Sequence, residues 1–79
     1  MIDKFINENL EKDLKSFELR DDIYVRYLAF CEHYKIQALT RTRFGKKLDE
    51  FNIGIRHKRM KNYVIETGRQ GVRLLSCKY

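Results

Sequence analysis

The spacing of apolar residues changes at Gly54 from a mainly helical period to that of a strand, and that change limits the folds that the chain can adopt. Before Gly54, apolar side chains recur every three or four residues, which is typical of amphipathic helices. After Gly54 they alternate with basic residues, which is the period of a strand. No proline interrupts either part. The sequence therefore predicts an α+β domain in which helices precede a strand-rich tail.

Three helices are expected before Gly54. The first covers about residues 2–14. The second covers about residues 21–35 and is nearly all core; its opening Asp21-Asp22 pair complements the helix dipole and can cap it. The third starts after Thr40, a plausible cap, and ends at Asn52 or Gly54 in a left-handed conformation. The inward positions are Ile2, Phe5, Ile6, Leu10, Leu14, Ile23, Tyr24, Tyr27, Leu28, Phe30, Cys31, Tyr34, Phe44, Leu48 and Phe51.

Three short extended segments complete the expected order. Phe17 and Leu19 alternate with polar residues between the first two helices. Residues 55–60 form a second strand, the glycine-containing segment 67–71 signals a turn, and residues 72–76 form a last strand. The tail is thus expected to be a β-hairpin with a basic loop. Helix, short strand, helix, helix and hairpin are the order of a winged helix-turn-helix, with three helices and a small antiparallel sheet. We expect residues 1–79 to form one such domain.

The charge is distributed unevenly along the chain. Residues 1–22 hold four basic and seven acidic groups, whereas residues 40–79 hold eleven and three, so the net charge of +6 hides an acidic start and a +8 end. A basic small domain suggests a polyanionic partner. A chain of 79 residues has too few residues to enclose a deep pocket that excludes water, so we do not expect an enzyme.

No catalytic or metal-binding pattern is expected either. Cys31 and His33 are two residues apart on a helix and diverge, and the remaining His57 and Cys77 add no zinc spacing. Cys31 is better explained as a buried small apolar residue. Asp21 and Asp22 suit a helix start rather than a pair of catalytic carboxylates. We therefore expect no metal and no cofactor.

Two segments carry a family resemblance. The residues Ile23-Tyr24-Val25-Arg26-Tyr27-Leu28-Ala29-Phe30-Cys31 and Arg43-Phe44-Gly45-Lys46-Lys47-Leu48 resemble the RFX-type winged helix, with its Y-x-x-Y-x-x-F-C, its S-F-G-K and an Arg-rich wing. They also resemble the C-terminal winged helix of phage, plasmid and poxvirus-type primase-helicases. Residues 2–10 look like the first helix of the family, so the similarity extends over most of the chain.

The resemblance places a few residues at DNA. Phe44, Gly45 and Lys46 match the start of the RFX third helix, where the Lys lies at the DNA. Arg56 and Arg59 lie near the Arg pair that RFX proteins place before the wing. The Gly-Thr-Arg-Gly and Ser-Lys-Tyr-His-Tyr run of RFX proteins is missing here, so the primase-helicase resemblance is preferred. It implies origin recognition for a phage, plasmid or mobile-element replication initiator, with an ATPase domain in the same polypeptide.

The basic residues of the third helix and the hairpin are the expected phosphate contacts, although such a cluster can also be a solvated face. Tyr63 stands in the basic hairpin, where base stacking, a phosphate hydrogen bond and packing are all open; Tyr24, Tyr27 and Tyr34 fit the core better. Thr42, Arg43, Lys46 and Asn62 are candidates for reading bases. The expected DNA-binding set is Arg41, Thr42, Arg43, Lys46, Lys47, Arg56, Lys58, Arg59, Lys61, Asn62, Tyr63 and Arg69.

The sequence thus predicts a non-catalytic module that binds double-stranded DNA. The third helix would enter a groove and the hairpin would follow an adjacent groove or the backbone. Single-stranded DNA is an alternative ligand. The domain could alternatively be the DNA-binding domain of a transcriptional regulator. A protein-docking winged helix is a further alternative, because Asp3, Glu8, Glu11 and Asp13 could form an acidic docking surface. With no transmembrane run and no secretory leader, we expect a cytoplasmic protein of a bacterial or phage- or plasmid-infected cell.

Overall fold

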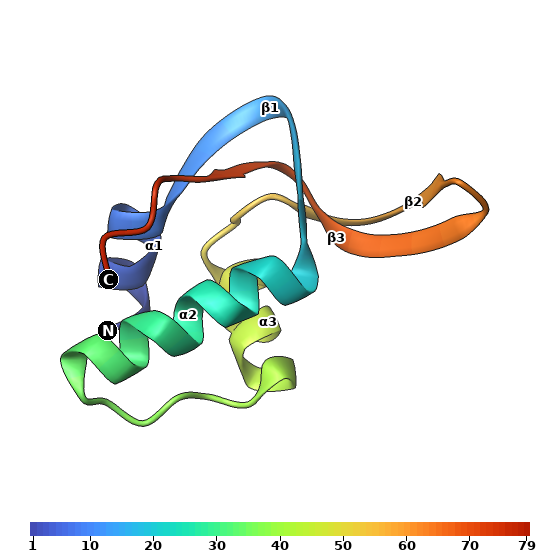
Figure 1. Ribbon diagram of the computed structural model, residues 1–79. Coiled ribbons are helices and arrows are strands. Elements are labelled where there is room, and N and C mark those ends of the chain that lie inside the picture. Colours follow the sequence, from blue (N-terminus) through green and yellow to red (C-terminus); the bar gives the residue numbers. More distant parts are fainter.

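The computed structural model describes residues 1–79 as three helices and a three-stranded antiparallel sheet (Figure 1). The elements are α1 (Ile2–Asn9), β1 (Leu10–Leu19), α2 (Arg20–Tyr34), α3 (Arg41–Glu50), β2 (Ile55–Lys61) and β3 (Val64–Leu74). The strand order is β1-β3-β2, so the first strand pairs with the C-terminal hairpin. This arrangement confirms the expected winged-helix α+β fold. No helix has both the length and the apolar content needed to cross a bilayer.

The first helix is shorter than the spacing of its apolar residues predicts. It ends at Asn9, whose buried side chain donates to the Phe5 carbonyl oxygen at 3.0 Å, while the Asn9 carbonyl accepts from the Leu75 amide at 2.8 Å. From Leu10 onward the chain pairs with β3 instead. The expectation of a helix to residue 14 was therefore wrong: Leu14 matches the helical period, yet 89% of it is exposed, so it contributes nothing to the core.

The capping residues of α2 and α3 mark where these two helices begin and end. The Thr40 side chain accepts a hydrogen bond from the Arg43 amide, which confirms it as the N-cap of α3. In α2, by contrast, Leu19 occupies the N-cap and Asp21 lies within the first turn, where its charge complements the helix dipole without capping. Lys35 follows α2 as its C-cap and has a left-handed conformation, with φ at 56°.

An aromatic cluster holds the three helices together. The ring of Phe5 in α1 lies 5.4 Å from that of Tyr27 and 5.6 Å from that of Phe44, edge to face in both cases. The rings of Tyr27 and Phe44 stack at 4.2 Å, which joins α2 to α3. Phe30 and Cys31 are also buried, as expected for the apolar face of α2. This packing fixes the direction in which the outer side of α3 points.

The hairpin turn lies nearer the N-terminus than the glycine-containing segment 67–71 predicts. β2 and β3 pair from Ile55 with Gln70 to Lys61 with Val64, and the turn consists of Asn62 and Tyr63, with φ at 51° and 65°. Two consecutive positive φ values are those of a type I′ hairpin turn. The segment 67–71, expected to be the turn, instead lies within β3. The expectation was wrong because neither glycine there serves to reverse the chain.

Gly68 is required by a close approach of two strands. A Cβ atom at this position would lie 2.1 Å from the Glu18 carbonyl oxygen of β1 and 2.7 Å from the Phe17 ring. Gly71 has φ at 89°, a backbone conformation that favours glycine, and it lies near the irregularity in the β1–β3 pairing between Lys12 and Phe17. Gly68 and Gly71 therefore allow β1 to pair closely with β3, and they do not form the turn of the hairpin.

Candidate nucleic-acid interface

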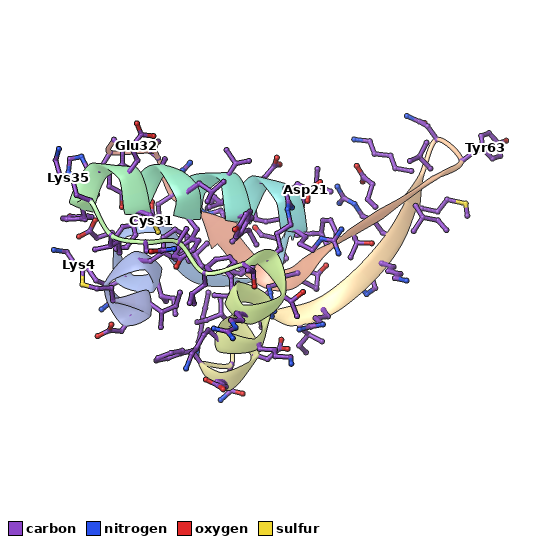
Figure 2. All side chains as sticks on the ribbon, turned by 90° about the horizontal axis from the view of Figure 1, so that it is seen from below. Lys4, Asp21, Cys31, Glu32, Lys35 and Tyr63 are labelled. Carbon is purple, nitrogen blue, oxygen red and sulfur yellow. The ribbon has the colours of Figure 1, made fainter.

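The outer part of the hairpin, residues 55–67, projects from the body of the domain, and we call it the wing. Figure 2 shows it as an arm with Tyr63 at its tip, far from Lys4, Glu32 and Lys35 at the other end of the molecule. All seven residues of β2 are exposed. The wing therefore offers both of its faces to solvent along most of its length.

A cleft of about 400 Å³ lies between the first turn of α2, one side of α3 and the base of the wing. We call it the α3–wing cleft. Its lining includes five basic side chains, namely Arg20, Arg41, Lys46, Arg56 and Arg69. The lining contains no carboxylate, so the cleft is suited to an anionic ligand.

One cation in the cleft is structural rather than free. Arg69 is only 5% exposed, and its guanidinium donates to the carbonyl oxygens of Ile53 at 3.0 Å and Gly45 at 2.9 Å. It also donates to the Asp49 carboxylate at 2.8 Å. Arg69 was expected to contact phosphate, but these three bonds use its guanidinium to fasten β3 to α3. Because the side chain is buried and held by these bonds, we do not include Arg69 among the DNA contacts proposed below.

Asp49 is shared by two arginines. Arg56 approaches its second carboxylate oxygen at 2.7 Å while Arg69 holds the first. Partial burial pushes the pKa of Asp49 upward, but the hydrogen bonds from Arg56 and Arg69 outweigh it and hold that pKa below its ordinary value. Asp49 therefore stays ionised and ties the base of the wing to α3.

Arg59 also serves the wing itself. Its guanidinium donates to Glu66 on the neighbouring strand at 2.8 Å and lies over the Phe17 ring, 4.1 Å from the centroid. Of the expected contacts, Lys47 is likewise paired, with Glu50 at 3.3 Å on the outer flank of α3. Both side chains are partly exposed, so they reach solvent, but each already has a partner of opposite charge.

Arg41 connects the first turn of α3 to the start of α2. It forms an ion pair with Asp21, and its guanidinium lies 4.7 Å from the centroid of the Tyr24 ring. Asp21 thus acts as an anchor for α3, at the end of α2 that faces the wing (Figure 2). Arg41 nevertheless remains exposed and lines the cleft.

The remaining expected contacts are exposed and have no side-chain partner. They are Thr42, Arg43 and Lys46 on α3 and Lys58, Lys61, Asn62 and Tyr63 on the wing. Thr42 and Lys46 line the α3–wing cleft. The structure therefore brings Thr42 and Lys46 together with Arg41 and Arg56 in one basic cleft, whereas the lining does not include Arg43 or the expected residues of the outer wing.

Sequence reasoning missed Arg20. It belongs to the acidic first block of the chain, and no local pattern marks it, yet the fold places it in the lining of the cleft. Its nearest counter-charge is Asp21 at 3.8 Å, a weak pairing for a side chain that is 67% exposed. The contribution of Arg20 to the cleft becomes visible only in the fold, which places the start of α2 beside α3.

The comparison with protein families selects between the two resemblances. The model of the RFX DNA-binding domain matches residues 1–67, which include α1 to α3, β2 and the tip of the wing. No curated protein matches the chain. The match supports the RFX resemblance and gives no support to the primase-helicase one, on which the origin, phage and ATPase expectations rested. The chain belongs to the RFX DNA-binding domain family.

Proposed function

We propose that the domain binds double-stranded DNA across the α3–wing cleft and along the wing. The observation that carries this proposal is the set of exposed cations on two adjacent elements that have no acidic partner. They are Arg43 and Lys46 on α3 and Lys58 and Lys61 on β2. Each such cation can neutralise a phosphate and release condensed counterions, which makes binding favourable and dependent on salt.

The shape of the wing supports a groove contact. A two-stranded antiparallel ribbon fits the major groove of B-form DNA, and the wing is such a ribbon, exposed along all of β2. With the wing in the groove, the cleft lies beside the adjoining backbone. There Lys46 and Arg41, which both line the cleft, can hold phosphates while the wing lies on the bases.

Asn62 and Tyr63 occupy the most protruding position of the molecule (Figure 2). Tyr63 is 98% exposed and contributes nothing to the core. A phenol held there can donate to a phosphate oxygen or stack on an unpaired base. We include both residues in the proposed interface.

Docking of a basic protein partner on the acidic first block is less well supported. Glu8 accepts hydrogen bonds from the hydroxyls of Tyr34 and Tyr79, and Glu11 is paired with Arg73. Asp13 accepts from Ser16 and from the Lys15 amide. These carboxylates are engaged within the fold, in contrast to the free cations of α3 and the wing. A role at a replication origin rests on the primase-helicase resemblance alone and is not part of the proposal.

Charge reversal tests the proposal. We expect the Lys46→Glu, Lys58→Glu double variant to lose most of the affinity for a duplex, measured by fluorescence anisotropy, while its circular dichroism and melting stay those of the parent. The control is Lys78→Glu, which reverses one lysine charge next to the C-terminus, at the opposite end of the molecule from the wing (Figure 1).

The same titration includes a single strand of identical sequence as competitor. The proposal requires the duplex to bind more tightly than the single strand. Equal affinity of the double variant and the Lys78 control, or preference for the single strand, would contradict it.

A further inference from the structure

The wing has two chemically different faces, and the strand register assigns each residue to one of them. In an antiparallel pair, opposed residues share a face and successive pairs alternate between faces. One face carries the pairs Arg56–Arg69, Lys58–Thr67 and Met60–Ile65, and the other carries Ile55–Gln70, His57–Gly68, Arg59–Glu66 and Lys61–Val64.

Contacts at the base of the wing show which face looks toward α3. Arg56 and Arg69 both bind Asp49 of α3, so the face with Met60 and Ile65 lies on the side of the α3–wing cleft. The other face is turned to β1, because Phe17 lies under Arg59 at 4.1 Å and its ring is 6.0 Å from that of His57. The face that continues the proposed DNA surface is thus the one that ends in Met60 and Ile65.

Met60 and Ile65 form an apolar cross-strand pair that the free domain leaves in water. Met60 is 69% exposed and Ile65 is 64% exposed, and neither belongs to the core or packs against it. Because the two side chains are mostly exposed, they contribute almost nothing to the stability of this fold. A pair of large apolar side chains kept in solvent on a projecting arm suggests a contact that forms only in a complex.

The basic residues near the pair indicate an anionic partner, and the pair itself requires that this partner present apolar groups on its surface. Lys58 precedes Met60 on the same face, and Lys61 follows Met60 in the chain on the opposite face. The one carboxylate of the wing, Glu66, is on the opposite face and bound to Arg59. In the major groove, the apolar point among the base edges is the C5-methyl group of thymine, and aliphatic side chains recognise it by direct contact.

We propose that Met60 and Ile65 contact thymine methyl groups when the wing lies in the major groove, and that this pair sets sequence preference. The inference rests on the proposed function. Phosphate contacts by the free cations supply affinity for any duplex, whereas the apolar pair distinguishes A·T pairs from G·C pairs at the positions it covers. Thr67, on the same face, offers one further methyl group to the same surface.

The test begins with selection of duplexes from a random library by the parent domain. We expect thymine to be enriched at one or two positions of the selected sites. Replacing that thymine by uracil removes only the C5-methyl group and keeps every base-pairing hydrogen bond. The parent should then bind about fourfold more weakly for each methyl removed, the factor that follows from burying one methyl-sized apolar group.

The variant that removes the apolar contact is Met60→Gln, Ile65→Thr. Both residues are exposed, and the replacements keep chain length at one and β-branching at the other, so the wing should persist. In this variant, thymine and uracil duplexes should bind equally, while affinity for unselected duplex DNA changes by less than about twofold. The matched control is Val64→Thr, which alters an equally exposed aliphatic residue, 61% exposed, on the opposite face.

Three outcomes would overturn the inference. The parent could bind selected sites with no sensitivity to uracil at any thymine. The Met60, Ile65 variant could retain the full thymine preference. Thirdly, sedimentation could show a dimer or a protein complex that this variant abolishes while thymine preference is unchanged. Absence of any duplex binding by the parent would instead refute the proposed function itself, so the two failures are distinct.

Discussion

Arg69 of β3 donates a hydrogen bond to the carboxylate of Asp49 in α3 at 2.8 Å, from a side chain that is almost wholly buried. This contact, together with the two carbonyl oxygens that the same guanidinium reaches, fixes the base of the wing relative to α3. The geometry of the proposed DNA surface therefore depends on an ion pair within the fold.

Replacement of Arg69 by Met is expected to destabilise the domain by about 3 kcal/mol, because it removes three hydrogen bonds from a buried, charged guanidinium, to the carbonyl oxygens of Ile53 and Gly45 and to Asp49. The exposed Arg56 binds the same carboxylate and provides the control: Arg56→Met should cost less than about 1 kcal/mol. Urea denaturation followed by circular dichroism measures both. Equal losses for the two variants would show that the Arg69 pair is not structural.

The Asp49 contact predicts a dependence of stability on pH. Because the pKa of Asp49 in the folded domain lies below its ordinary 3.8, its stabilisation is complete above that value and is lost as pH falls through the lowered pKa. The free energy of unfolding of the parent should therefore drop more steeply between pH 5 and pH 2 than that of Asp49→Asn. Parallel curves for the two proteins would contradict this account.

Two glycines should respond to alanine in opposite directions. Gly68→Ala places a Cβ against the backbone of β1 and should destabilise the sheet by more than about 2 kcal/mol. Gly45 lies inside α3, and its nearest atom is the flexible end of Arg56 at 3.5 Å. Gly45→Ala should therefore stabilise the helix by up to about 1 kcal/mol. Thermal melting of both variants measures these effects. A melting temperature of Gly68→Ala equal to that of the parent would contradict the close contact between β3 and β1.

Tyr63 is held at a positive φ that glycine would adopt more easily. We expect Tyr63→Gly to stabilise the turn by about 1 kcal/mol, the approximate strain of a left-handed residue, and to weaken duplex binding at the same time. Amide hydrogen exchange of the wing measures the first effect and anisotropy the second. Unchanged affinity would remove Tyr63 from the interface.

The order of the elements could be predicted from the sequence because helical and strand spacing are local properties. The N-cap at Thr40, the extent of α2 and the burial of Cys31 and Tyr27 follow from patterns within one element and are confirmed. The end of α1 could not be predicted, because Leu10 and Leu14 keep the helical spacing and only pairing with β3 shows that they lie in a strand.

The site was partly predictable for a related reason. Basic residues of α3 and the wing are visible in the sequence, but which of them are free depends on partners distant along the chain. Arg69 pairs across 20 residues with Asp49, and Arg20 joins the cleft from an acidic segment. Positive φ at Asn62 and Tyr63 carries no glycine signal, so the turn was placed at the glycines instead.

The salt dependence of duplex binding tests the central claim most directly. We predict that the logarithm of the association constant falls linearly with the logarithm of salt concentration, and that Lys46→Ala and Lys58→Ala each reduce the magnitude of the slope by about one. The Lys78→Ala control should leave the slope unchanged. A slope near zero for the parent, or equal slopes for all four proteins, would contradict duplex binding through α3 and the wing.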